Sequence, residues 1–213
     1  DVSHIVIIAL DLSYSVGFGL DVATKFGRAK EAALAIVLAA QESGAQLGLI
    51  TFADRVVKFF PPCRGSSWAS LIIQEIINAT LQEGKTDLIA CFRHIMLMKG
   101  GRFIVFLCSD FISDDFEKDL AVLSRRHELV AVELLSDLEL EIPGAGYVSL
   151  VDAESGQELF LSVSEKISYA LRKRKSALDA CFKKYKVGVI QITERSCAVE
   201  CIVAFFARSM AYK

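Results

Sequence analysis

A short apolar run that ends abruptly in polar side chains constrains the fold of this chain most strongly. Residues 5–10 read Ile-Val-Ile-Ile-Ala-Leu, and Asp11, Ser13 and Ser15 follow at alternate positions. A bounded run rich in Ile and Val is typical of a strand buried on both faces, as in the middle of an α/β sheet. Ligands of such sheets bind just beyond the carboxyl ends of the strands. We therefore expect Asp11, Ser13 and Ser15 to lie at a ligand-binding edge.

Predicted strands and helices alternate along the rest of the chain. This alternation predicts an α/β fold of three layers, with a mainly parallel central sheet and helices on both faces. Besides residues 5–10, we predict strands at 46–52, 102–109, 128–135 and 186–192, and helices at 25–43, 66–82, 86–98, 114–126, 164–184 and 194–210.

Two pairs of closely spaced strands predict hairpins. Strands 46–52 and 55–60 are joined by a very short turn, so one of them should be an antiparallel edge strand, which Pro61 and Pro62 end. Residues 147–151 and 158–162 predict a small hairpin insertion, joined through residues 152–156, after an irregular segment that begins at Pro143.

Composition limits the classes of function. Of the 213 residues, 53% are hydrophobic, which argues for an ample core, and the net charge of −2 predicts neither nucleic-acid nor membrane binding. No run reaches the ~18 apolar residues that a membrane span needs. We expect a single domain over residues 1–213 that is a piece of a longer chain. Its expected location is cytoplasmic, with any membrane attachment through a missing N-terminal region.

The cysteines and histidines argue against a zinc site. None of the six cysteines forms a Cys-x-x-Cys pair, and the three histidines are scattered. Cys91 and Cys108 lie inside apolar segments and are predicted to be buried thiols, while Cys197 and Cys201 are four residues apart on a predicted helix. We expect a reducing compartment.

Oxygen-bearing side chains from three distant segments should meet at one edge of the predicted sheet. Thr86, the predicted cap of helix 86–98, and Asp110, just past strand 102–109, would join the residues that follow the first strand. Hydroxyls and carboxylates suit Mg²⁺ best, with Mn²⁺ or Ca²⁺ as alternatives. Two close carboxylates repel each other unless a cation lies between them. Asp11, Ser13 and Ser15 alone would fit an ordinary turn with helix caps, but Thr86 and Asp110 favour a metal site.

The set of Asp11, Ser13, Ser15, Thr86 and Asp110 resembles the metal-ion-dependent adhesion site of von Willebrand factor A-like domains. More narrowly, the chain is similar to the bacterial and archaeal branch called "domain of unknown function 58". The similarity covers nearly the whole chain. The segments that carry it are residues 84–88, 107–111 and 126–132, followed by Leu140, Ile142 and Pro143.

This resemblance implies a Rossmann-like, non-enzymatic protein-interaction module. It implies that Ser13, Ser15 and Thr86 bind the cation directly, that Asp11 and Asp110 act through water, and that an acidic side chain of a partner protein completes the coordination. It also implies a MoxR-type AAA+ ATPase as a partner, in the maturation of other proteins. The chain departs from many members at Lys85, where they have Gly; this lysine would either repel the cation or point to solvent.

The strongest enzymatic alternative is a haloacid-dehalogenase-like, Mg²⁺-dependent phosphohydrolase that uses Asp11. That chemistry needs a second Asp two residues later as acid and base, and here this position is Ser13. The glycine-rich loops of nucleotide-binding enzymes and the nucleophile elbow of serine hydrolases are missing. A basic cluster (residues 172–175 with Lys183, Lys184 and Lys186) is expected to be solvated surface, with a docking patch for an acidic partner as the alternative.

Overall fold

The computed structural model describes residues 4–17, 22–113, 115–135, 146–151, 158–163, 165–193 and 195–211. Within them the strands are β1 (Ile5–Asp11), β2 (Gln46–Phe52), β3 (Val56–Cys63), β4 (Phe103–Ser109), β5 (Glu128–Leu135), β6 (Gly146–Val151), β7 (Glu158–Val163) and β8 (Gly188–Thr193). The helices are the short 3₁₀ turn η1 (Tyr14–Gly17), α1 (Val22–Glu42), α2 (Ser66–Asn78), α3 (Leu88–Leu97), α4 (Glu117–Arg126), α6 (Glu165–Lys184) and α7 (Ala198–Ala211).

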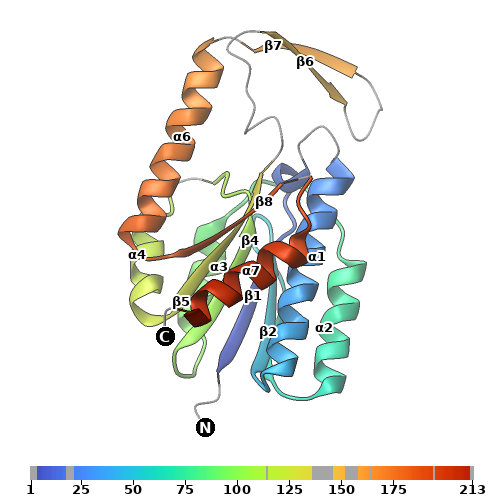
Figure 1. Ribbon diagram of the computed structural model, residues 1–213, viewed down its shortest axis with the longest axis vertical. Coiled ribbons are helices and arrows are strands. Elements are labelled where there is room, and N and C mark those ends of the chain that lie inside the picture. Colours follow the sequence, from blue (N-terminus) through green and yellow to red (C-terminus); the bar gives the residue numbers. More distant parts are fainter. Residues whose placement is uncertain are drawn as a thin grey trace.

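The central sheet has six strands in the order β3-β2-β1-β4-β5-β8. All neighbouring pairs are parallel except β2 and β3, so the predicted mainly parallel sheet with one antiparallel edge strand is confirmed. From β1 the sheet extends to β2 on one side and to β4 on the other, with Ile5 opposite both Gln46 and Phe103. Such a switch point opens a crevice at the carboxyl ends of the strands, which lie at the top of the sheet in Figure 1.

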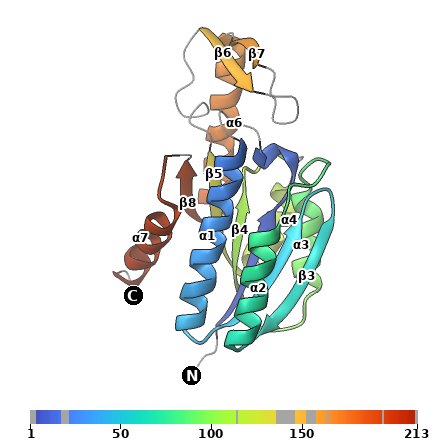
Figure 2. The ribbon, with the colours of Figure 1, turned by 90° about the vertical axis from the view of Figure 1, so that its right-hand side faces the viewer.

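Helices cover both faces of this sheet, as predicted (Figure 2). Because successive residues of a strand point to opposite faces, Ile8 belongs to the apolar core that includes residues of α1, α2 and α7, whereas Ile7 belongs to the core that includes residues of α3, α4 and α6. Helix α1 lies close to the sheet because small residues face it: Ala29, Ala32 and Ala33 are fully buried. Two apolar cores, one on each face, therefore hold the strand ends in place.

The edge strand β3 is longer than the sequence predicted. The expectation that Pro61 and Pro62 end it is wrong, since β3 continues to Cys63, which lies opposite Leu47. Proline has no amide proton for a neighbouring strand, but an edge strand pairs on one side only and tolerates it there. The register is irregular between Leu47 and Leu49, which accommodates the two prolines.

Helix α2 begins at Ser66, the first residue of its predicted range, but ends earlier than predicted. No serine side chain caps it: the cap residue is Gly65, with φ of 111°, and the helix ends at Asn78 instead of reaching residue 82. Its buried face consists of Ala69, Ile72 and Ile76, while Leu71 and Ile77 are exposed. Helix α4 begins only at Glu117.

Strands β6 and β7 pair antiparallel and form a separate two-stranded sheet, with Gly146 opposite Val163. This confirms the predicted hairpin, which Figure 1 shows to the right of the upper end of α6. The connection at 152–156, the irregular segment from Pro143, and Leu140 and Ile142 lie outside the described residues. Within the described part of the chain, none of the helices combines the length and the apolar character that crossing a membrane requires.

Candidate metal centre

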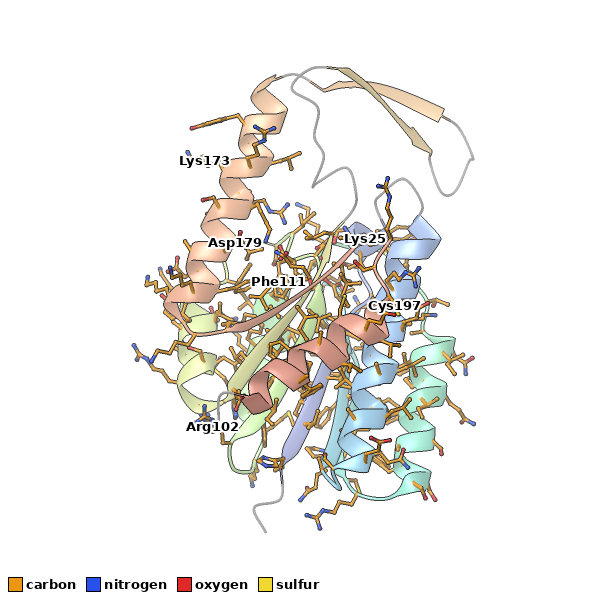
Figure 3. All side chains as sticks on the ribbon, viewed as in Figure 1. Lys25, Arg102, Phe111, Lys173, Asp179 and Cys197 are labelled. Atoms are coloured by element: carbon orange, nitrogen blue, oxygen red, sulfur yellow. The ribbon has the colours of Figure 1, made fainter. Side chains whose placement is uncertain are left out.

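The structure brings the five predicted site residues together at the carboxyl edge of the sheet, beside the switch point between β1 and β4. Asp11 is the last residue of β1, Ser13 and Ser15 follow it, and Asp110 directly follows β4. Thr86 comes from the connection between α2 and α3. Figure 3 labels Phe111, the neighbour of Asp110, at this end of the sheet.

Three hydroxyl groups form a triangle in this site. The Thr86 Oγ1 atom lies 2.6 Å from Ser13 Oγ and 2.8 Å from Ser15 Oγ, and the two serine oxygens are 3.0 Å apart. Ser13 and Thr86 are buried, whereas Ser15 is half-buried and forms the outer corner. Each oxygen keeps lone pairs beyond those used in the triangle, so the three can act together as ligands for one cation.

The carboxylate of Asp11 lies fully buried beneath the hydroxyls. Its Oδ1 accepts a hydrogen bond from the Ser13 amide at 2.9 Å, and its Oδ2 accepts one from the Ser109 hydroxyl at 2.6 Å. Burial raises the pKa of Asp11 to about 6, although these hydrogen bonds lower it in part, and the nearby Asp110 raises it further. A buried charge of this kind is costly without a counter-charge.

Asp110 is also buried and lies beside a lysine. Its Oδ1 accepts a hydrogen bond from the Ile112 amide at 2.9 Å, and its Oδ2 lies 3.9 Å from Nζ of Lys25. Lys25, which Figure 3 labels near the upper end of α1, belongs to the first turn of that helix and is only 2% exposed. The sequence does not indicate a role for Lys25, because a lysine near a helix start carries no local sign of burial.

Hydrogen bonds hold the loop with Thr86 against two neighbouring segments, the loop with Ser13 and the segment after β4. The amide of Gln82 donates to the carbonyl of Leu12 at 2.7 Å, and the hydroxyl of Ser113 donates to the carbonyl of Thr86 at 2.9 Å. Gly84 has φ of 124°, and a side chain there would come within 3.3 Å of Asp54. The hydroxyl triangle thus depends on residues outside the five that the sequence predicted for the site.

The prediction that Thr86 caps the next helix is wrong. Asp87 caps α3, because its Oδ1 accepts a hydrogen bond from the amide of Ala90 at 2.9 Å. The side chain of Thr86 contacts the two serines instead. Lys85 is exposed to solvent. Lys25, in contrast, lies close to a site carboxylate, that of Asp110.

Helix α6 approaches the site through part of the predicted basic cluster. The guanidinium of Arg174 donates to the carbonyl of Asp110 at 3.2 Å, and Nζ of Lys175 lies 2.8 Å from Oε2 of the buried Glu133. A small cavity of about 50 Å³ lies between these side chains and Asp110. Arg172 and Lys173 are exposed, as expected for solvated surface. Arg174 and Lys175 instead contact the protein, so the prediction of solvated surface holds for only part of the cluster.

The cysteines behave as predicted where they lie in the core. Cys91 and Cys108 are fully buried, and burial raises the pKa of the Cys108 thiol to about 12 and raises that of Cys91 further. All six cysteines are free thiols. Among the residues that the structure describes, no three His, Cys, Asp or Glu side chains gather as a metal-binding group.

Comparison with families of known sequence gives one match over most of the chain. The model of the family described as "Protein of unknown function DUF58" matches residues 1–179. Uncharacterized protein Rv1480 of Mycobacterium tuberculosis is 27% identical over 154 residues, which cover 70% of this chain and 48% of that protein. Uncharacterized protein Mb1516 of Mycobacterium bovis gives the same figures. The chain thus spans about half the length of these curated relatives.

Solved structures share the fold at low sequence identity. BatB from Bacteroides thetaiotaomicron, described as a conserved hypothetical protein, has a TM-score of 0.63 at 12% identity, over 99% of this chain and all of that one. An aerotolerance-related membrane protein from Bacteroides fragilis has a TM-score of 0.57 at 15% identity, covering 96% and 98% of the two chains. The SpRpn10 VWA domain has a TM-score of 0.53 at 14% identity, covering 95% and 94%. The likeness establishes a von Willebrand factor A-like fold.

Proposed function

Because the chain belongs to the DUF58 family and has a von Willebrand factor A-like fold, we propose that it is a non-enzymatic protein-interaction module that binds a divalent cation. The cation would be held by Asp11, Ser13, Ser15, Thr86 and Asp110, with Mg²⁺ as the first candidate and Mn²⁺ or Ca²⁺ as alternatives. The observation that carries the proposal is the triangle of three hydroxyl oxygens, all within 3.0 Å of one another and contributed by two separate loops.

The donor set fits a hard cation. Hydroxyl and carboxylate oxygens are the ligands that Mg²⁺ prefers, and the cation usually keeps several of its waters. The three hydroxyls would bind directly, while Asp11 and Asp110, which accept hydrogen bonds from backbone amides and from Ser109, would balance the charge. The two buried carboxylates supply negative charge that a cation would neutralise.

The partner is proposed to contribute an acidic side chain. Ser15, the half-buried corner of the triangle, makes the site reachable from outside. A carboxylate of the partner would complete the coordination, and this chain would contribute the fixed hydroxyls that orient it. A MoxR-type AAA+ ATPase, acting in assembly or maturation of other proteins, is the partner we propose, and the family resemblance alone supports that choice.

Metal-induced stabilisation tests the proposal. A ligand that binds only the folded state stabilises it, by about 2.7 kcal/mol at a hundred times its Kd. The melting temperature of the wild type is expected to rise with Mg²⁺ or Mn²⁺, and Thr86→Ala is expected to lose most of this response. Thr80→Ala, at an exposed threonine in the same connection, is the matched control. Equal responses of wild type and Thr86→Ala would show that the site is assigned wrongly.

A second experiment separates a binding module from an enzyme. Purified protein bound to a partner from its native extract should release it when a chelator is added, and Thr86→Ala should capture less of it than Thr80→Ala. A phosphohydrolase would instead turn over an aryl phosphate and lose this activity in Asp11→Asn. In the structure, the position that such chemistry needs as acid and base is Ser13, whose hydroxyl belongs to the triangle.

A further inference from the structure

The most unusual group near the site is the ammonium of Lys25. Its side chain is 3% exposed, and its Nζ lies 3.9 Å from Oδ2 of Asp110, whose own side chain is fully buried. Lysine is almost never buried to this degree unless it is paired. Lys25 also belongs to the first turn of α1, where the helix dipole disfavours a positive charge. The carboxylate of Asp110 beside it offsets part of both costs.

That carboxylate is one of the five proposed cation-binding groups. An ammonium beside Asp110 reduces the negative potential that this carboxylate offers to a dication, and it repels the dication directly. Both effects are strong here because buried charges are poorly screened by water and salt. Lys25 and a bound cation would therefore compete for the same negative charge.

We propose that Lys25 is a built-in competitor that weakens the affinity of this site for divalent cations. The inference rests on the proposed function and adds a residue that sets how readily the site fills. In the metal-free protein Lys25 neutralises Asp110, and occupancy of the site requires this ion pair to weaken. A partner carboxylate that completes the coordination would then help to retain a cation that the site alone binds weakly.

Isothermal titration calorimetry with Mg²⁺ and with Mn²⁺ tests this inference. Lys25→Met, which keeps the length of the side chain and removes its charge, is expected to tighten binding of both metals at least tenfold. Lys25→Gln, which keeps a polar group near Asp110, should also bind both metals more tightly than the wild type. It provides a second test if the methionine variant does not fold. Lys85→Met is the matched control, because Lys85 adjoins Thr86 in sequence but is exposed; its affinity should stay within twofold of the wild type.

The outcomes separate this inference from the proposed function. Tighter metal binding in both Lys25 variants than in the wild type supports the inference. If the variants bind the metal and the wild type does not, the inference is still supported, but the proposed metal binding by the natural chain is contradicted. Unchanged or weaker binding in folded Lys25 variants, with a wild type that binds, overturns the inference and leaves the proposed function in place. Absence of binding in every variant overturns both.

The stability of the metal-free protein gives a second readout. Removal of Lys25 leaves Asp110 without this neighbouring positive charge, so the metal-free variants are expected to melt at a lower temperature than the wild type. Saturating Mg²⁺ should then raise the melting temperature of Lys25→Met by more than it raises that of the wild type. An equal or smaller rise would show that Lys25 has a structural role alone.

Discussion

At the scale of single residues, Ser109 has a role that its position in the sequence does not reveal. Its hydroxyl donates to Asp11 at 2.6 Å and accepts from the amide of Phe111 at 3.0 Å. Phe111 has a positive φ of 55°, an uncommon conformation for a residue with a side chain. Ser109 therefore fixes both the buried carboxylate and the turn that carries Asp110.

Replacing Ser109 by alanine is expected to destabilise the protein by about 1–3 kcal/mol, because a buried carboxylate oxygen and a buried amide each lose a partner. Urea unfolding followed by circular dichroism measures this change. Ser124→Ala is the control, since Ser124 is half-buried on α4 and donates to the carbonyl of Ala121 within the same helix. A loss in Ser109→Ala no larger than in Ser124→Ala would contradict the assigned role.

His127 predicts a pH dependence of stability. It is 3% exposed, stacks on Phe103, and accepts a hydrogen bond from the Phe103 amide at Nδ1. Burial lowers its pKa below the ordinary value of 6.5, and Arg126 and Arg102 lower it further. Below about pH 6.5 the unfolded chain therefore binds more protons at this residue than the folded chain does. The stabilisation that depends on neutral His127 is complete above that pH and is lost as the pH falls.

The variant His127→Asn keeps an acceptor for the Phe103 amide and removes the titrating ring. Its free energy of unfolding, measured in urea between pH 7.5 and 5, should fall less on acidification than that of the wild type. The wild type must be measured in parallel, because Asp11 has the opposite effect on the free energy of unfolding. Its pKa is raised in the folded protein, so protonation of this carboxylate on acidification stabilises the folded state. The control is His4→Asn, at an exposed histidine. Parallel pH profiles for wild type and His127→Asn would contradict the prediction.

At the scale of elements, the sequence predicted the central strands better than the helix ends. The bounds of β2 and β5 agree with their predictions to the residue, since a strand buried on both faces is an apolar run with polar limits. Helix α2 ends early because the chain after Asn78 leaves it, and Gln82 then hydrogen-bonds to Leu12. No local pattern in the sequence reports such a contact between distant segments.

The same distinction holds for the site. Its five predicted residues could be chosen by residue type and by their place after strands or before a helix. Lys25, Ser109 and Ser113 could not be assigned roles, because their parts depend on which groups the fold places beside them. Sequence reasoning thus identified the oxygen donors but not the side chains that position and neutralise them.

Helix α6 is expected to depend on the pair of Lys175 and Glu133. Glu133 is 1% exposed and accepts hydrogen bonds from Lys175 at 2.8 Å and Gln191 at 3.1 Å. Lys175→Met removes the charged donor and should destabilise the protein by about 1.5–3 kcal/mol, a range typical of hydrogen bonds to charged groups. Thermal and urea unfolding measure this loss. Lys173→Met, at an exposed residue of the same helix, should change stability by less than about 0.5 kcal/mol.

At the scale of the whole molecule, two cysteines report on the two faces of the sheet. Cys108 belongs to the core under α1, α2 and α7, and Cys91 belongs to the core under α3, α4 and α6. Burial protects both thiols and raises their pKa, whereas Cys63 and Cys197 are exposed. Cysteine reactivity can therefore show whether the two cores unfold together.

In native protein, a thiol reagent is expected to modify Cys63 and Cys197 quickly and to leave Cys91 and Cys108 unmodified. The two buried thiols should become reactive over the same range of urea concentration, because both cores pack on the same six strands. Mass spectrometry of peptides identifies the modified residues. Modification of Cys91 at a clearly lower urea concentration than Cys108 would show that the face covered by α3 and α4 opens separately.

The hydroxyl triangle has a consequence for the protons of the site. Ser13, Ser15 and Thr86 each carry a single hydroxyl proton, and their oxygens make three mutual contacts. A cyclic arrangement, in which each hydroxyl donates to the next, uses all three protons inside the ring and directs lone pairs outward. Three oxygens could then approach a dication without giving up a proton. At pH 8, where Asp11 is already ionised, the heat of Mg²⁺ binding should therefore be the same in buffers of very different ionisation enthalpy.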